Sequence, residues 1–294
     1  MFVIMSYVKH VASVIHSVVR KNSMSELKTI RVGLVSGGRE STAMVRKAEL
    51  LYGENFFQKK IFADTGDDPE GLSTVEYLNK NKGWNVQIVK SKYGNIRKYY
   101  EDKIVDNEPE FIGHAMPSQA NKDCSLKFKI IPISTELRAE FGDDVFFELF
   151  FGFSFSKKEV HRLKATKERL EKTKIKQTAR SILIENHLTR KDSGEICMEY
   201  LGFIPERSLC DMCFERTKQD WKDFNKKHPE RFMSVVEFDE SSKLYKKYGY
   251  GLSSGSLRKI VRLRDESQTT LDVKPCPCIQ DFAILDEQEC ATVV

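Results

Sequence analysis

Short apolar runs, rich in β-branched or aromatic residues, alternate with helical patterns along the first half of the chain. The runs lie at residues 30–35, 59–63 and 85–89, and helical patterns follow the first two at 39–49 and 71–80. A further run at 145–151, VFFELFF, has the length of a buried strand. Alternation of strands and helices at this spacing predicts a parallel sheet with helices on both faces. We therefore expect an α/β fold.

A Ser-Gly-Gly turn joins the first strand to the first helix. Ser36, Gly37 and Gly38 let the backbone turn sharply and approach a ligand closely. Backbone N–H groups in such a turn, followed by a helix N-terminus, favour phosphate or pyrophosphate, and Ser41 adds a hydroxyl. The loop has neither the Gly-Lys-Ser/Thr of a Walker A motif nor a G-x-G-x-x-G turn. A plain glycine turn of an α/β domain is the alternative.

Composition limits the partners and the compartment. The net charge of +5 over 294 residues permits an anionic partner, such as a nucleic acid, and equally fits a solvated basic surface. No apolar run reaches the roughly 20 residues of a membrane span, so no membrane partner is expected. The seven cysteines are an odd number without an export signal, which favours metal or redox use in a reducing, cytoplasmic compartment over a disulfide framework.

The patterns divide the chain into four parts. They are an N-terminal amphipathic helical extension (1–27), a nucleotide-binding α/β domain (28–204), a helical Cys-x-x-Cys subdomain (205–264) and a C-terminal tail (265–294). In the second part, Thr189 is expected to cap a helix in which Cys197 packs in the core. In the third, a loop is expected from Tyr245 to Leu257. The Cys276-Pro-Cys278 sequence of the tail is either a mobile terminus or a second ligand pair.

The sequence SGGRES resembles the Ser-Gly-Gly-x-Asp-Ser loop of the PP-loop superfamily of ATP pyrophosphatases and sulfonucleotide reductases. The resemblance implies a Rossmann-like fold of the adenine nucleotide alpha hydrolase type. It also implies that the loop holds the pyrophosphate end of ATP or the phosphosulfate end of an activated sulfate nucleotide. The loop residues concerned are Ser36, Gly37, Gly38, Glu40 and Ser41. The chain departs from the motif at Glu40, where Asp is usual, and has Arg39 where many members have Lys.

Three further segments resemble the same superfamily. Asp64-Thr65-Gly66 is similar to a strand end of the reductase branch, which implies that Asp64 lies beside the ribose or adenine; a turn or capping role is the alternative. Cys124 and Lys127 resemble a cysteine and a lysine brought to the nucleotide, and nearby lysines favour the Cys124 thiolate. A looser match after the fourth strand points to three residues, Gly152, Glu159 and Arg162. The charged run from Lys157 to Lys176 is expected to be a solvated helix or loop.

Cys210-x-x-Cys213 is the strongest metal signal in the sequence. Two thiolates at this spacing reach one metal, but they do not complete a tetrahedral site. In some branches of the superfamily an upstream cysteine completes such a pair, which makes Cys124 the third ligand by resemblance. The metal would be a [4Fe-4S] cluster with one open iron or a Zn²⁺ ion. A redox pair or simple packing are the alternatives.

Taken together, the residues and the resemblance predict an enzyme that binds ATP and Mg²⁺ and adenylylates a substrate with release of pyrophosphate. Arg39, Lys127 and Cys124 are the expected catalytic residues. The acceptor would be a nucleic acid, with sulfur transfer to it, or a small molecule, and the chain would act as a homodimer. Two other hypotheses stay open. One is a sulfonucleotide reductase or sulfotransferase, although no terminal Glu-Cys-Gly is present. The other is a non-catalytic nucleotide-binding module of a regulatory or defence assembly.

Overall fold

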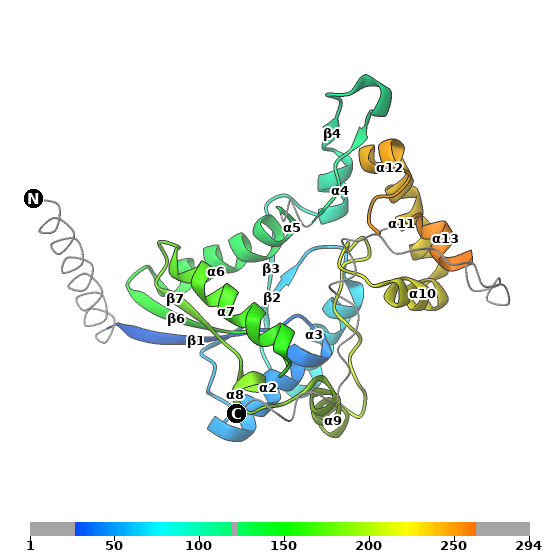
Figure 1. Ribbon diagram of the computed structural model, residues 1–294. Helices are drawn as coiled ribbons and strands as arrows, with labels where there is room; N and C mark the ends of the chain where they lie inside the picture. The colour runs from blue at the N-terminus through cyan, green and yellow to red at the C-terminus, as the bar shows by residue number, and fades with distance from the viewer. Residues whose placement is uncertain (1–26, 119–122, 254, 263–294) are drawn as a thin grey trace, which may run out of the picture. The chain divides into compact units, whose positions relative to one another are not determined.

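The protein consists of two compact units, each built from two segments of the chain. The computed structural model describes residues 27–118, 123–253 and 255–262. Of these residues, the first unit, here the sheet unit, comprises 27–92 and 125–208; the second, the helical unit, comprises 93–118, 123–124, 209–253 and 255–262. Figure 1 follows these segments by colour along the chain. The expected helix at 1–27 lies almost entirely outside the described residues, and Cys276 and Cys278 lie wholly outside them.

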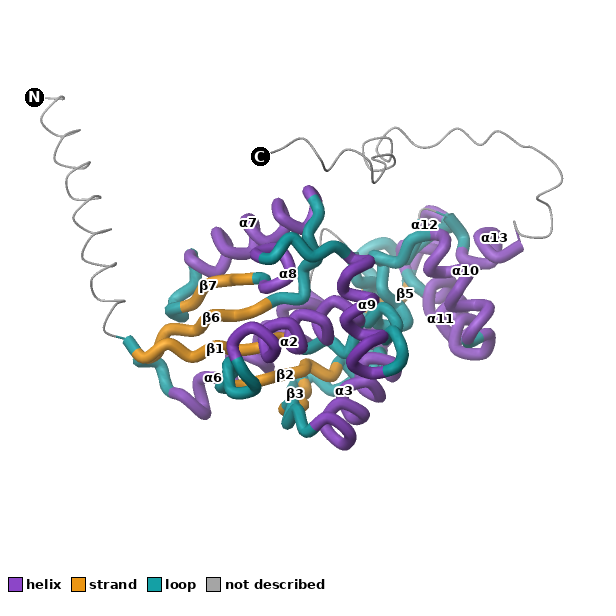
Figure 2. The backbone as a smooth tube through the Cα atoms, turned by 90° about the horizontal axis from the view of Figure 1, so that it is seen from below, coloured by secondary structure: helices purple, strands orange, loops and turns teal. Residues whose placement is uncertain are grey.

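Five parallel strands form the sheet of the sheet unit, which confirms the predicted fold class. They are β1 (Lys28–Leu34), β2 (Lys59–Asp64), β3 (Gln87–Lys90), β6 (Val145–Phe150) and β7 (Gln177–Arg180). Their order is β3-β2-β1-β6-β7, with every pair parallel (Figure 2). The chain moves outward from β1 to β3 and then returns to the other side of β1 as β6. The strand order therefore reverses at β1, the position at which open α/β sheets bind ligands.

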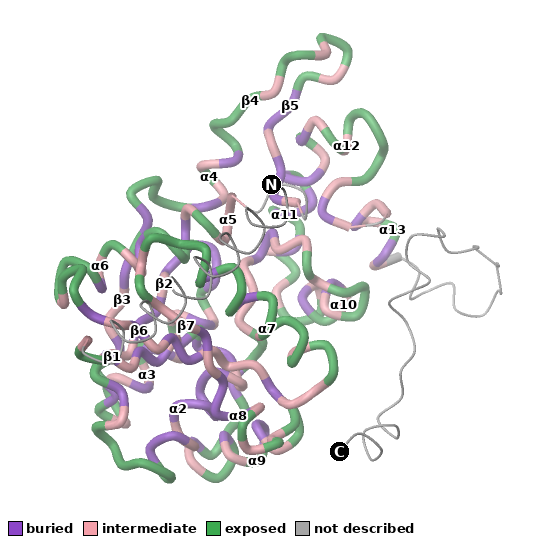
Figure 3. Tube along the Cα trace, turned by 60° about the vertical axis from the view of Figure 1, so that its left-hand side comes forward, coloured by how far each residue is buried: buried purple, intermediate pink, exposed green. Residues whose placement is uncertain are grey.

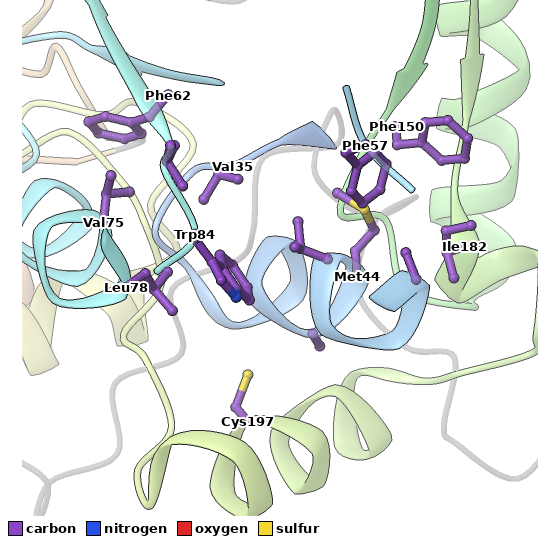
Figure 4. Packing of buried hydrophobic residues seen from close by; sticks show 14 of the residues in the cluster. Val35, Met44, Phe57, Phe62, Val75, Leu78, Trp84, Phe150, Ile182 and Cys197 are labelled. Atoms are coloured by element: carbon purple, nitrogen blue, oxygen red, sulfur yellow. The ribbon is translucent and has the colours of Figure 1, made fainter. Parts of the chain in front are cut away.

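Helices cover both faces of this sheet through two apolar clusters. One cluster joins it to α2 (Arg39–Tyr52), α3 (Pro69–Lys82), α8 (Ile182–Glu185) and α9 (Arg190–Leu201). Figure 4 shows Met44, Trp84 and Cys197 in this cluster. The other cluster joins the sheet to α6 (Ile131–Phe141) and α7 (Lys157–Glu171). Cys197 is 1% exposed and burial raises the pKa of its thiol to about 12, so its predicted role in core packing is confirmed.

Local capping signals fix where several of these helices begin. Thr189 caps α9, as the sequence predicted, and Asp192 completes a reciprocal capping box with it. The helix expected at 71–80 starts earlier, at Pro69, because Asp68 caps it and proline suits the first helical position. Ser156 accepts a hydrogen bond from the backbone N–H of Glu159 at the start of α7. The charged run at 157–176 is thus helical over most of its length.

The helical unit is held together by contacts between its two segments. The first contains α4 (Ile96–Glu101), β4 (Ile104–Val105), η1 (Pro109–Phe111) and β5 (Gly113–His114). The second contains α10 (Lys218–Lys227), α11 (Pro229–Ser241), α12 (Lys243–Tyr248) and α13 (Leu257–Arg262). The His114 imidazole bridges them, because its Nε2 lies 2.7 Å from the carbonyl oxygen of Phe238. The loop expected from Tyr245 begins only after Tyr248, where α12 ends.

A short irregular helix links the end of the helical unit's first segment to α6. It consists of α5 (Asp123–Ser125) and the π-helical turn η2 (Leu126–Ile130). π-Helical turns are rare and occur frequently at functional sites. None of the described helices is both long and apolar enough to cross a bilayer.

Candidate nucleotide-binding loop and cysteine pair

The Ser36–Gly38 loop lies at the carboxyl end of β1, between this central strand and α2. Gly37 has a φ of +76°, and a Cβ at this position would lie 2.1 Å from the carbonyl oxygen of Gly71. Only glycine can therefore occupy the position without moving the start of α3. Gly152, in the loop after β6, also approaches α2 closely, since a Cβ there would lie 2.5 Å from the Ser41 nitrogen. The loop and the start of α2 are thus confined by backbone segments that follow the two neighbouring strands, β2 and β6.

Two serine hydroxyls hold the loop in shape. The backbone N–H of Ser36 donates to Ser41 Oγ at 3.0 Å, and the two hydroxyl oxygens also lie 3.0 Å apart. Ser41 Oγ donates in turn to the carbonyl oxygen of Gly38 at 3.0 Å. Ser41 is buried, and its one hydroxyl hydrogen is already used inside the loop. In this conformation Ser41 shapes the loop and does not offer a free donor to a ligand.

The N-terminus of α2 has no side-chain cap. Gly38 is the N-cap residue, and no side chain hydrogen-bonds to the first turn from this position. The first N–H groups of a helix have no partner within the helix, and they carry partial positive charge. The uncapped first turn therefore presents donors to an anion at the end of the sheet where the strand order reverses.

Arg39 and Glu40 form a small charged cluster beside this turn. Arg39 Nη2 lies 3.3 Å from Glu40 Oε1, and Arg190 Nε lies 3.1 Å from the same oxygen. The Arg39 Nε atom is buried and has no hydrogen-bond partner among the described residues. Two guanidinium groups neutralise the Glu40 carboxylate. The cluster keeps a net positive charge and one unused buried donor.

Asp64 shapes a turn at the end of β2. It is buried, its Oδ1 accepts the backbone N–H of Gly66 at 2.8 Å, and its Oδ2 lies 3.3 Å from Lys90 Nζ. Thr65 beside it is also buried, and Gly66 adopts a φ of +74°. The geometry is that of an Asx turn. A role for Asp64 beside a nucleotide stays a prediction.

Sequence reasoning missed a buried carboxylate next to the loop. Asp68 caps α3 by accepting the Gly71 N–H at 3.0 Å, and it accepts the Ser208 hydroxyl at 2.5 Å. Burial raises the pKa of Asp68, and the bonds from Ser208 and Gly71 partly oppose this rise. The Asp-Pro pair at 68–69 signals a helix start in the sequence. Nothing in the sequence indicates its partner, because Ser208 lies 140 residues away.

Of the other site residues predicted in the sheet unit, Gly152 lies beside the residues that shape the loop. Gly152 adjoins Ser41, as described above. Glu159 and Arg162 pair with each other at 3.5 Å, and the Arg162 guanidinium lies 4.7 Å from the centre of the Phe153 ring. Lys127 lies in η2, where its carbonyl oxygen accepts the Ser91 hydroxyl at 2.8 Å. A contact of Glu159, Arg162 or Lys127 with a nucleotide stays a prediction.

The cysteine pair belongs to the helical unit. The backbone N–H of Cys213 donates to the carbonyl oxygen of Cys210 at 3.0 Å, which closes the turn between them. Both thiols are partly buried and in no disulfide. Arg216 donates to the carbonyl oxygens of Leu209 and Cys210. Arg231 pairs with the buried carboxylate of Asp211 at 2.5 and 2.9 Å. Side chains on both sides therefore fix the turn.

A complete metal site is not assembled by the described residues. Cys124, the expected third ligand, is in the helical unit too, next to the buried phenol of Tyr100. Across 27–118, 123–253 and 255–262, no group of three or more His, Cys, Asp or Glu side chains is placed to hold a metal ion. Cys210 and Cys213 thus fit two positions of a ligand set. The metal site with Cys124 stays a prediction.

Among known proteins, similarity is found only at the level of solved structures. No protein-family model matches the chain, and no curated protein matches it. Among solved structures, the U34-tRNA thiolase NcsA from Methanococcus maripaludis, with its [4Fe-4S] cluster, is similar. The sequence identity is 15% and the TM-score is 0.39, over 88% of this chain and 84% of that one. At this level of similarity the thiolase assigns no role to any residue of this chain.

Proposed function

We propose that this chain, whose fold and loop position are those predicted by the resemblance to the PP-loop superfamily, binds ATP and adenylylates a substrate. The observation that carries the proposal is the Ser36–Gly38 loop. It follows the central strand where the strand order reverses, and it leads into a helix without a side-chain cap. A backbone cradle of this kind suits the pyrophosphate end of a nucleotide.

The proposed reaction is a substitution at the α-phosphorus of ATP. A substrate oxygen forms a bond to that phosphorus, the bond to the bridging oxygen breaks, and pyrophosphate leaves with the electron pair. Arg39 would stabilise the charge that develops on the leaving group, because its buried Nε has no partner among the described residues. Lys127 is the second cation expected there. Bound Mg²⁺ would supply further charge neutralisation on the phosphates.

The adenylylated substrate would then react with a sulfur or nitrogen nucleophile, which displaces AMP. A nucleic acid or a small molecule is the acceptor in this proposal, with sulfur transfer as the leading reaction. Cys124, Cys210 and Cys213 would hold the [4Fe-4S] cluster or Zn²⁺. Since the described residues bring no three such ligands together, no step is assigned to that metal. The homodimer likewise stays a prediction.

Pyrophosphate release tests the proposal directly. Purified protein is incubated with ATP and Mg²⁺ and with candidate acceptors, and pyrophosphate is measured together with ATP affinity. We expect Arg39→Gln to slow release by about a hundredfold, because a charged donor to the leaving group is lost. The control is Arg46→Gln, on the same helix, whose guanidinium pairs with Glu49 at 3.8 Å. It should release pyrophosphate at the rate of the unmodified protein.

Two results would replace the proposal. Preferred binding of a phosphosulfate nucleotide, with a thiol that becomes covalently modified, would indicate a sulfonucleotide reductase. Tight ATP binding without pyrophosphate release, with every acceptor tested, would indicate a nucleotide-binding module that does no chemistry.

A further inference from the structure

The net positive charge of the described sheet unit lies on one segment, helix α7 and the five residues that follow it. Residues 157–176, which contain α7, carry nine lysines and arginines but only three glutamates. Over the other described residues of this unit, lysines and arginines equal aspartates and glutamates in number. The whole excess of positive charge in the described sheet unit therefore lies on this segment.

Most of these cations are exposed and uncompensated. Helix α7 buries Thr166 and Leu170 toward the sheet, and its remaining surface is largely open to solvent (Figure 3). Two ion pairs involve the segment, Arg162 with Glu159 and Lys176 with Asp144. Six exposed lysines form no ion pair within the described part of the chain: Lys157, Lys158, Lys164, Lys167, Lys172 and Lys174. A face that served only for solubility would be expected to mix both signs of charge.

The residue types on the exposed face of α7 favour one class of anionic partner over membranes and proteins. Val160 is the only large apolar side chain exposed on α7, so the helix lacks the apolar face that membrane-surface helices insert. It also lacks the exposed aromatic anchors that concentrate binding energy at protein interfaces. Binding to phosphate backbones needs neither of these, because lysines and arginines that neutralise phosphates release the counterions condensed on the nucleic acid. A 15-residue helix is about 22 Å long, so it can reach several consecutive phosphates.

We propose that the exposed face of α7 binds the phosphate backbone of a nucleic acid. The contact would position the polymer without reading its sequence, since lysines bind phosphates as point charges. This binding does not depend on ATP or on pyrophosphate release. It can therefore hold or fail independently of the function proposed above.

The test measures the binding of a labelled RNA hairpin and a labelled DNA duplex by anisotropy, without nucleotide, at several salt concentrations. The variant replaces Lys164, Lys167 and Lys172 with glutamine. We expect at least about tenfold weaker binding at 0.1 M salt, and a slope of log Kd against log salt that is shallower by about 2 to 3. The matched control replaces Lys28, Lys80 and Lys191, three exposed lysines of the same unit, and should bind as the unmodified protein does.

Three results would overturn the proposal. They are no binding of either nucleic acid at 0.1 M salt, equal losses in the two triple variants, and equally tight binding of poly-glutamate or of anionic vesicles through the same lysines. Thermal unfolding of both variants checks that the fold is kept, which is expected because all six side chains are exposed.

Discussion

The Ser36–Gly38 loop and the Cys210–Cys213 turn are built in different ways. The loop is defined by local features: a left-handed glycine, close approach of the Gly71 and Gly152 backbone, and hydrogen bonds of the Ser41 hydroxyl with Ser36 and Gly38. The cysteine turn is fixed by arginine side chains as well as by a backbone hydrogen bond, and the metal site predicted for it needs a further ligand that the described residues do not bring to it. A loop held by neighbouring residues takes its shape when the chain folds. A metal site forms only when all of its ligands are in place.

The largest loss of stability is expected when one methyl group is added to the loop. Gly37→Ala places a Cβ 2.1 Å from the carbonyl oxygen of Gly71 at a φ of +76°, so we expect a loss of more than about 3 kcal/mol in the free energy of unfolding. Gly83→Ala is the control, because Gly83 has a φ of +64° and nothing within 4 Å of the added atom. It should cost about 1 kcal/mol, as measured by denaturant unfolding. Equal costs would mean that the loop tolerates displacement.

Each unit contains a buried carboxylate, and the two differ in their hydrogen-bond partners. Asp68 in the sheet unit receives bonds from Ser208 and Gly71, whereas Asp239 Oδ2 in the helical unit is buried and finds no partner among the described residues. Burial raises the pKa of Asp239 to about 6; Glu240 adds to the rise, while the Leu252 N–H and His114 oppose it. The folded state therefore holds this proton more tightly than the unfolded state. Stability from this group falls as pH rises from about 4 to about 6.

The size of this effect is on the order of 3 kcal/mol between pH 4 and pH 7. Denaturant unfolding of the full chain across this range measures it, with Asp239→Asn as the comparison. The variant cannot ionise, so its stability should change less with pH than that of the unmodified protein. Parallel pH profiles for the two proteins would rule out the assignment to Asp239.

A smaller effect is expected where a buried carboxylate loses one of its donors. Ser208→Ala removes the 2.5 Å bond to Asp68, and we expect it to cost about 1 to 2 kcal/mol in the free energy of unfolding at neutral pH. The pKa of Asp68, already raised by burial, should rise further. Ser134→Ala removes an exposed serine that bonds to the carbonyl oxygen of Ile131, and it should cost less than about 0.5 kcal/mol. Similar costs for the two variants would show that Asp68 is stabilised without Ser208.

The smallest change in stability should come from the cysteine pair. In protein treated with a chelator, Cys210→Ala should cost less than about 1 kcal/mol, because the thiol is only partly buried. Cys197→Ala, in the core, should cost more. Anaerobically purified protein is then compared by metal analysis and by absorption near 400 nm. We expect bound metal to be lost in Cys210→Ala and kept in Cys197→Ala; a metal content that both variants share would remove Cys210 from the ligand set.

Local patterns predicted the sheet unit well, because its signals are short-range. The apolar runs marked four of the five strands, all but β7, Ser-Gly-Gly marked the loop, and Thr189 marked the start of α9. Features that depend on distant residues escaped prediction. The Ser208 bond to Asp68 has no local signal. The π-helical turn at Leu126–Ile130 was likewise not predicted from the sequence.

The division into units also depends on residues far apart in the sequence, so local patterns did not predict it. Residues 93–124 were expected within the nucleotide-binding domain, whereas the structure groups them with the C-terminal helices. Their attachment rests on contacts such as Arg97 with Ser234 and His114 with Phe238, and each joins segments far apart in the sequence. Charge and hydrophobic periodicity carry no information on such pairings. Roles of the predicted site residues toward a nucleotide are likewise beyond what either periodicity or geometry assigns.

The two-segment construction of the helical unit sets an order of events during synthesis. His114 and its partner Phe238 are 124 residues apart, so the first segment leaves the ribosome long before its partner exists. At about 5 to 20 residues per second, the delay is roughly 6 to 25 seconds. During that time the hairpin of β4 and β5 has no α11 to pack against. Nascent chains of this protein therefore pass through a stage in which a future core is exposed, when they are most open to chaperones and to aggregation.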